Sequence, residues 1–480
     1  MPIDSRHPLY NEFIGDWQKC RDTFNGTRSV KGRASSVGGS LGGSDTYEGS
    51  YYLPPLSGQS KSEYMAYKGR ALFNNITGRA THGLVGVMTR LNPTIEAPDD
   101  MAEYFTDATG TGITFNELLR FSILEILLTD RLGLLPDMDE SGNRPYIVPV
   151  TSEDMVNWSI DTSDSADFVV LRESVWKPSP DDIYEQKLQT NYRELTYDKD
   201  GNYIINIWAD TSSGQYSQSS YEIIDTKMPK IKGAPIKMMP FTPVNSIGIS
   251  WDINKSVLID LAEVNLSHYK TSADLEHGRH FTALPTPVLT GINSDTKLSI
   301  GSTTALAIAD PRAKAYFLEF TGQGLGSLEN AIKEKEFQMS SMSARLIDQN
   351  RKGSEAAETV RLRYSGEANM LAGIAGALEV AVNHVYNIIA EWLGHSYGDV
   401  KIVLNRDFLD NSMSDGALNV LTDMYLKKVI DLDTYIYNLK RGEIIEPGLS
   451  EDEIKQRFIG LKTFEYQSKL NSGEDNNVKV

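Results

Sequence analysis

Two long helical stretches separated by a short basic segment constrain the fold of this chain more than any other feature. The first spans about residues 325–347, and the second, the strongest helix signal in the chain, spans about 366–392. In the second stretch the apolar residues recur at three- and four-residue steps, which places them on one helix face: Leu371, Ile374, Leu378, Val382, Val385, Ile389 and Trp392. We therefore expect a long helix buried along one side. Gly373, Gly376 and Ala377 add a small-residue edge that a neighbouring helix could approach closely.

The segment between these helices, residues 348–363, carries four basic side chains: Arg351, Lys352, Arg361 and Arg363. We expect it to be a loop, because it is polar and interrupts the apolar pattern. A loop between buried helices must direct its charges to water or to an anionic partner. The segment alone leaves both interpretations open: an ordinary solvated loop, or a contact site for an anion.

Length and charge narrow the class of protein. A chain of 480 residues has room for roughly three domains. The net charge of −18 argues against a protein that wraps nucleic acid by neutralising its charge. Such a surface suits solubility, or a surface to which DNA does not adhere. The single cysteine, Cys20, excludes an internal disulfide and fits folding in a reducing cytoplasm. We see no secretory signal and no membrane-spanning stretch.

The order of expected elements predicts an α+β fold. Helices are expected first, then strands, then helices again, with a glycine–serine linker at residues 34–45. The early helices are expected at 1–33, 61–75, 80–89 and 115–131, the last with a capping box formed by Thr114 and Glu117. The strands are expected at 146–150, 168–176, 192–197, 203–208, 221–224 and 238–241. The later helices include 252–279 and 434–441, with Gly442 as a C-cap and a further capping box at Ser450 and Glu453.

No catalytic, cofactor or metal site is expected. His277 and His280 lie three residues apart, but two ligands do not make a zinc site, and no further Cys or His lies near them in the sequence. The glycines of TGQGLGS, residues 321–327, match neither a phosphate-binding loop nor a dinucleotide fingerprint, and we interpret them as a hinge or a helix-entry loop. The sequence has no nucleophile elbow, and Cys20 lies in a polar helix.

Four segments, in order, resemble the portal proteins of tailed bacteriophages. They are YYLPPLSGQSKSEYMAYKGRALFNNITGRATHGLVGVMTR (51–90), GISWDINKSVLIDLAEVNLSHYKTSADLEHGRHF (248–281), the helix–loop–helix of 325–392, and DLDTYIYNLKRGEII (431–445). Their order, more than any single motif, carries the resemblance.

The resemblance implies a ring, usually of twelve copies, at one capsid vertex of a virion assembled in the host cytoplasm. Double-stranded DNA would pass through its channel during packaging and ejection. The implied partners are the major capsid protein and scaffold, the terminase large subunit and a head–tail adaptor or neck protein, with no membrane. A ring of Arg351, Lys352, Arg361 and Arg363 would face the DNA.

The resemblance also implies boundaries. They are 1–50 for an N-terminal arm and linker, 51–250 for a wing, 251–281 for a first stem helix, 282–322 for a small β-containing clip, 323–347 for a second stem helix, 348–363 for a tunnel loop, 364–395 for a long wing helix, and 396–480 for a helical crown or outer wing. Two other classes stay open: another phage head–neck structural protein, and an enzyme with an unrecognised site.

Overall fold

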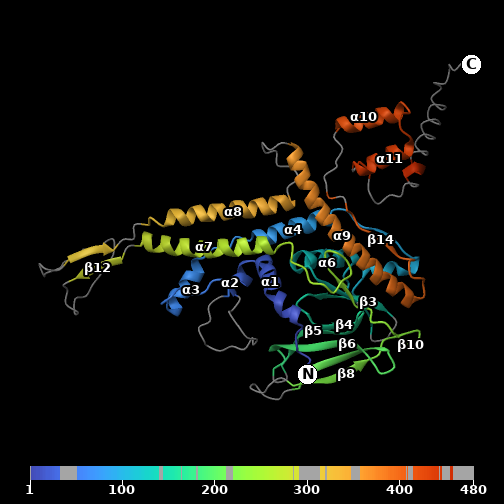
Figure 1. The fold of residues 1–480 in the computed structure, drawn as a ribbon, viewed down its shortest axis with the longest axis horizontal. Helices are drawn as coiled ribbons and strands as arrows, with labels where there is room; N and C mark the ends of the chain where they lie inside the picture. The colour runs from blue at the N-terminus through green and yellow to red at the C-terminus, as the bar shows by residue number, and fades with distance from the viewer. Residues whose placement is uncertain are drawn as a thin grey trace, which may run out of the picture.

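The computed structural model describes residues 2–32, 51–139, 144–163, 165–179, 182–211, 220–284, 286–290, 314–318, 322–347, 357–406, 408, 415–442, 444–445 and 454–457. It is a mixed α+β structure with antiparallel sheets, as the sequence predicts. The largest sheet lies at one side, and a pair of long helices projects away from the body (Figure 1). The linker predicted at 34–45 and the capping box predicted at Ser450 and Glu453 lie outside the described residues.

Helices form the first part of the chain. They are α1 (Pro8–Asn25), α2 (Thr27–Gly32), α3 (Lys61–Arg70), α4 (Ile76–Met88), the 3-10 turn η1 (Asp99–Met101), α5 (Ala102–Thr106) and α6 (Phe115–Thr129). Capping boxes begin α3 at Ser60 and α6 at Thr114, where the Glu side chain three residues on bonds back to the cap. The box at Thr114 and Glu117 is the one the sequence predicts. Helix α3 ends at Arg70, earlier than the expected 75.

A five-stranded antiparallel sheet follows, in the order β4-β5-β6-β7-β8. Its strands are β4 (Met155–Ile160), β5 (Ala166–Pro178), β6 (Gln186–Tyr197), β7 (Tyr203–Asp210) and β8 (Tyr221–Lys227). The predicted hairpin is confirmed: Tyr197 pairs with Tyr203 across a turn in which the Asp198 carboxylate accepts from the amides of Asp200 and Asn202.

Smaller sheets join distant parts of the chain. A three-stranded sheet has the order β11-β2-β3, from β2 (Leu132–Met138), β3 (Pro145–Thr151) and β11 (Thr242–Val244). Two pairs are β1 (Thr94–Glu96) with β14 (Lys401–Val403), and β9 (Lys230–Ile231) with β10 (Ala234–Pro235). The strand expected at 238–241 is wrong: β11 starts at Thr242, directly after Pro240 and Phe241, and a proline has no N–H to give to a ladder.

Long helices complete the fold. They are α7 (Ile259–Ala283), α8 (Leu325–Ile347) and α9 (Ala357–Leu393), followed by α10 (Asp415–Leu426) and α11 (Leu432–Arg441). Helix α7 was expected from residue 252. It begins later, because the Ser256 hydroxyl accepts from the Leu258 amide in a turn and also donates to the Leu127 carbonyl. Gly442 is the C-cap of α11, as predicted.

The core has three clusters, and α9 connects two of them. One lies among α4, α6, α7 and α9, and it includes Leu371, Ile374 and Leu378. Another lies between α1 and the five-stranded sheet, and it includes Ile388 and Trp392 from the end of α9. The third joins α3 to α7 through Tyr64, Tyr67 and Tyr269. The apolar face predicted from the sequence is thus buried along its whole length.

Candidate functional site

The projecting hairpin of α7 and α8 is the most distinctive feature of the molecule (Figure 1). The first part of α7 is anchored in the body by the buried Leu261, Leu266 and Tyr269. At the far end, β12 (Thr286–Thr290) and β13 (Lys314–Leu318) form a two-stranded antiparallel sheet in which Val288 pairs with Tyr316. Both strands lie within the range 282–322, for which the sequence resemblance implies a small β-containing clip.

Specific contacts hold the two helices of the hairpin together. Arg279 of α7 bonds Glu276 on its own helix at 2.9 Å and Glu329 of α8 at 2.8 Å. These hydrogen bonds raise the pKa of Arg279 and lower the pKa of Glu329. The Lys335 ammonium donates to the Ser267 carbonyl, also across the pair. The hairpin is therefore held along its length by polar contacts as well as by apolar packing.

Glycines allow the start of α8 to lie close to α7. A Cβ on Gly278 would come 2.6 Å from the Leu325 Cδ2 atom, so the leucine lies directly over the glycine. Gly322 has a φ of +65°, and its carbonyl accepts from the Leu325 amide to start the turn into α8. This agrees with the interpretation of TGQGLGS as a helix-entry loop.

Several large apolar side chains of the hairpin are exposed. Phe337 on α8 is 74% exposed, and Phe317 in β13 is 61% exposed. Phe281 and Leu284 at the end of α7 are also exposed. Exposed apolar side chains in this number mark an interaction surface more often than a free one.

The four basic residues singled out from the sequence are only partly described. Arg351 and Lys352 lie outside the described residues. Arg361 and Arg363 lie in helix α9, which begins at Ala357, so the expected loop of 348–363 is wrong for residues 357–363. The sequence AETV has good helix formers and no proline or glycine, and the helix extends back through it.

A row of polar side chains on α9, missed in the sequence, fixes the segment that follows the helix. Glu379, Asn383 and Asn387 are four residues apart and so share one face. Asn387 accepts from the amides of Gly398 and Val400 and donates to the Val400 carbonyl. Asn383 makes the matching pair of bonds with Ile402, and Glu379 accepts from the Leu404 amide. The four-residue spacing of these polar residues was the available signal.

The expected small-residue edge of α9 has a different use. No atom lies within 4 Å of a Cβ built on Gly373, and Gly376 faces the guanidinium of Arg406 instead of a neighbouring helix. Arg406 also bonds Glu379 at 2.7 Å.

The described residues hold neither a metal-binding cluster nor an activated cysteine. No cluster there of three or more His, Cys, Asp or Glu could hold a metal ion. His277 instead lies between the Arg70 guanidinium, at 3.2 Å, and the ring of Phe281. Burial raises the pKa of Cys20 to about 12, which leaves a poor nucleophile. None of the described helices is both long and apolar enough to cross a membrane.

The family comparison matches the part of the chain that contains the α7–α8 hairpin and α9. Residues 257–393, from the end of the loop before α7 to the end of α9, match the family described as a domain of unknown function (DUF4055). No curated protein matches the sequence.

Among solved structures, the chain is similar to two described as the virion of a native gene transfer agent (GTA) particle and the neck of an empty GTA particle. Each has 12% identity and a TM-score of 0.36, over 80% of this chain and 94% and 95% of theirs. It is also similar to an HK97-family phage portal protein from Corynebacterium diphtheriae, with 11% identity and a TM-score of 0.31, over 70% of this chain and 96% of the other.

Proposed function

We propose that this chain is a phage portal protein, which forms a ring of about twelve copies at one capsid vertex. The ring would be the channel for double-stranded DNA during packaging and ejection. It would also be the platform on which the terminase large subunit, and then a head–tail adaptor, dock. The major capsid protein and the scaffold would surround it.

One observation carries the proposal: a two-helix hairpin with a β tip projects from an α/β body, and the chain then returns through α9 (Figure 1). This is the order that the portal-like sequence segments imply. In the ring, α7 and α8 would be the stem, β12 and β13 the clip, and the segment before α9 the tunnel loop. The exposed Phe281 and Phe337 on the hairpin would then be covered by neighbouring copies.

The ring is tested by negative-stain imaging and native mass spectrometry of the purified protein. We expect rings with a central hole and a mass of about twelve chains. Only monomers and dimers at micromolar concentration would contradict the proposal. A shell, or a measured ATPase or nuclease activity, would favour one of the other two classes instead.

We further propose that Arg351 and Lys352 face the DNA in the channel. A ring of basic side chains gives a screened, sequence-independent attraction to phosphate, and the overall charge of −18 keeps that attraction weak enough for sliding. Arg361 and Arg363 belong to the same proposal. Their positions are two apart on a helix, however, so the two do not share a face. The opposing interpretation is that these side chains pair with Glu355 or Glu358.

The double variant Arg351→Ala with Lys352→Ala, assembled into particles, tests the DNA contact. We expect normal rings and capsids with impaired packaging or DNA retention, and a weaker dependence of retention on salt. The matched control is Lys427→Ala with Lys428→Ala, which replaces another pair of consecutive basic residues, both exposed. This control should package DNA like wild type. Wild-type packaging and retention by the first variant at every salt concentration would show that this segment does not hold DNA.

A further inference from the structure

One end of the five-stranded sheet is an exposed apolar knob. The β5–β6 hairpin extends beyond the core, and at its end Trp176 is 64%, Ile183 69% and Tyr184 86% exposed. Trp176 pairs directly across the ladder with Leu188, which is also exposed, so the two lie on the same face. We define Trp176, Ile183, Tyr184 and Leu188 as the hairpin tip. Exposure of such an apolar group to water does not stabilise an isolated monomer, so the group marks an interaction surface.

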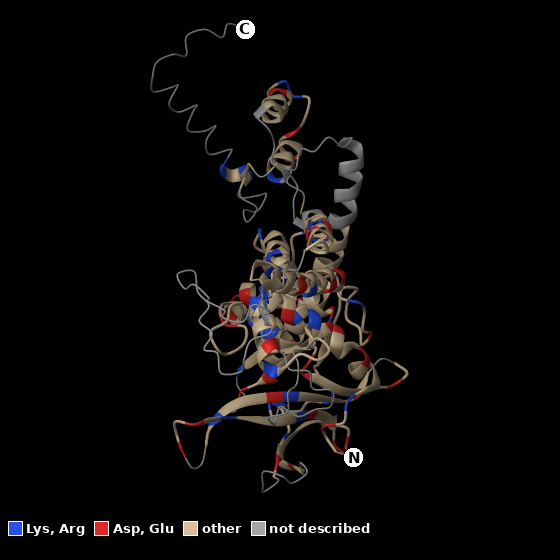
Figure 2. Ribbon diagram, turned by 90° about the vertical axis from the view of Figure 1, so that its left-hand side faces the viewer, with Lys and Arg blue, Asp and Glu red and all other residues tan. Residues whose placement is uncertain are grey.

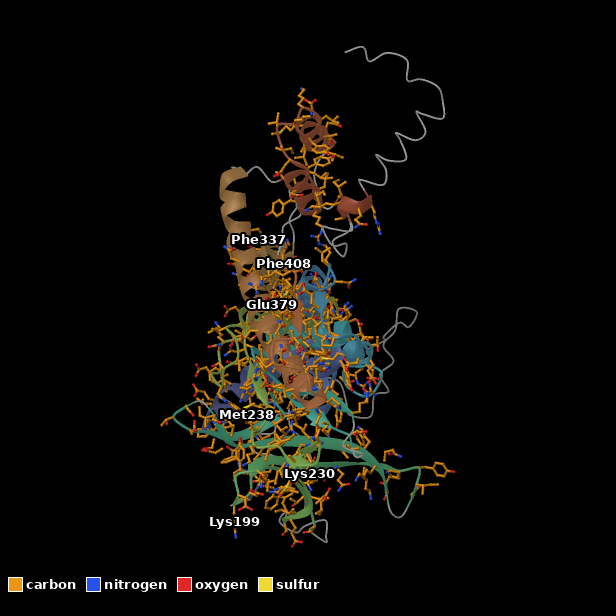
Figure 3. The ribbon with its side chains drawn as sticks, turned by 90° about the vertical axis from the view of Figure 1, so that its right-hand side faces the viewer. Lys199, Lys230, Met238, Phe337, Glu379 and Phe408 are labelled. Atoms are coloured by element: carbon orange, nitrogen blue, oxygen red, sulfur yellow. The ribbon has the colours of Figure 1, made fainter. Side chains whose placement is uncertain are left out.

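The opposite end of the same sheet carries a pocket of about 270 Å³ with both polar and apolar groups in its walls. Phe241 and Trp251 stack at 5.7 Å on one side of it, and Met238 and Met239 contribute flexible apolar walls. The β4–β5 turn closes it with Ser165 and Ala166. In Figure 3, Met238 and Lys199, which lies in the β6–β7 turn, are both toward the left-hand end of the sheet. We define this as the sheet pocket.

The volume of the sheet pocket suits one large aromatic side chain. A cavity of roughly 150 Å³ lined by apolar side chains holds a benzene ring. A volume of 270 Å³ therefore has room for a phenol ring and its Cβ. The pocket also has polar groups, Ser250 and Asp252, that could receive a phenol hydroxyl, while the stacked rings would contact its faces. Tyr184 is the most exposed aromatic side chain of the hairpin tip.

The placement of tip and pocket suits a head-to-tail contact. They lie at opposite ends of β5, Ala166–Pro178, which spans roughly 40 Å at about 3.3 Å per residue. The strands run across the direction in which the α7–α8 hairpin projects, as Figure 2 shows from the hairpin side. A patch that fits a different patch on the next copy gives a heterologous interface, which closes into a ring when the rotation allows.

Both ends of the sheet carry charged side chains. Lys177 and Lys187 lie directly opposite each other in the β5–β6 ladder, and Glu185 pairs with only the second of them. Beside the sheet pocket, Asp252 lines the wall, and Asp161 and Asp167 flank the β4–β5 turn. Approach of Lys177 to these carboxylates favours this orientation of two copies over the reverse, and Asp182, whose carboxylate accepts from the Tyr184 amide, opposes it in part.

We propose that Tyr184 of one copy occupies the sheet pocket of the next copy, so that the sheet links neighbours around the outside of the ring. Trp176 and Leu188 would cover the rim of the pocket. The proposal rests on the proposed function, because a ring supplies the repeated rotation. It adds the contact surface and the anchoring residue.

Disulfide trapping in the double variant Tyr184→Cys with Ser165→Cys tests the contact. Both positions are exposed, and the native Cys20 is buried and does not compete. We expect a ladder of covalent oligomers on mild oxidation, ending at the ring number. Each single variant alone should give no ladder, and co-expression of the two single variants should give covalent dimers. The control Tyr437→Cys with Ser165→Cys uses another exposed tyrosine and should remain uncross-linked.

The outcomes separate this contact from the proposed function. Rings without cross-links above the control would overturn the contact and leave the portal proposal standing. A ladder in protein that forms no closed ring would support the contact and refute the portal proposal. Cross-links only to a different protein of the particle would overturn the choice of a second copy as the occupant.

A second variant, Tyr184→Ala, measures the contribution of the anchor. We expect ring assembly by mass photometry to need at least tenfold more protein, because central aromatic anchors dominate interfaces. The melting temperature of the unassembled chain should not change, since the side chain is exposed. Tyr437→Ala is the matched control. Assembly of Tyr184→Ala at the wild-type concentration would overturn the assignment.

Discussion

Replacement of Asn387 by alanine should release the segment that leads from α9 to the C-terminal helices. The side chain is 4% exposed and bonds the Gly398 amide at 2.7 Å, the Val400 amide at 3.3 Å and the Val400 carbonyl at 2.9 Å. Val400 is itself 2% exposed, so water cannot readily replace the lost partner.

The expected magnitude follows from those bonds. Each bond contributes about 1 kcal/mol net, and a buried group left unpaired costs about 1–3 kcal/mol. Loss of the bonds to Gly398 and Val400 should therefore weaken local stability by about 3–5 kcal/mol. Asn383→Ala should cost less, because Asn383 is only half-buried and its bonds to the Ile402 amide and carbonyl are more accessible to water.

Hydrogen exchange followed by mass spectrometry measures this directly. Peptides covering residues 396–404 should lose at least a hundredfold of their protection in Asn387→Ala, since each 1.4 kcal/mol is a factor of about ten. The control is Asn438→Ala on α11, where the amide only bonds the Thr434 carbonyl on an exposed surface. If protection changed less than threefold in Asn387→Ala, the side chain would not be what holds this segment.

Two further predictions concern the core and the N-terminus. Gly133→Ala should destabilise the chain by about 1–3 kcal/mol through overpacking, because the new Cβ would clash with Phe241 Cζ and lie 3.1 Å from Met155 Sδ. Chemical unfolding measures the loss, and the added substitution Phe241→Leu should recover part of it. Strictly additive costs of the two substitutions would contradict the clash. The His7 ring caps α1 by accepting from the Leu9 amide through Nδ1, and burial and the nearby Arg131 lower its pKa. A histidine with a lowered pKa binds fewer protons when folded, so its stabilising effect is present above the unfolded pKa near 6.5 and is lost as pH falls through that value. Wild type should therefore lose stability relative to His7→Asn, which keeps a cap, as the pH falls from about 7 to about 5. Thermal unfolding of both proteins measures this, and a difference in melting temperature that stays constant over that pH range would show that His7 does not titrate in this way.

Much of the fold can be predicted from the sequence, because local patterns coincide with the tertiary structure. The apolar periodicity of 366–392 fixes which face of α9 is buried, and the capping box at Thr114 and Glu117 marks the start of α6. The Asp-Gly turn between two β-rich runs gives the β6–β7 hairpin. These signals act over a few residues, so they are readable without knowing the neighbours.

Other features depend on residues far apart in the chain and could not be predicted locally. Helix α7 begins at Ile259 because Ser256 bonds the distant Leu127 carbonyl, and the polar row on α9 has a role only when residues 398–404 return alongside it. The sheet pocket needs Ala166, Phe241 and Trp251 together, and sequence periodicity does not report such a meeting. The sequence by itself thus determined most of the elements and the buried face of α9. The tertiary structure decided which polar groups find partners and which apolar surfaces stay exposed, because both depend on packing between distant segments.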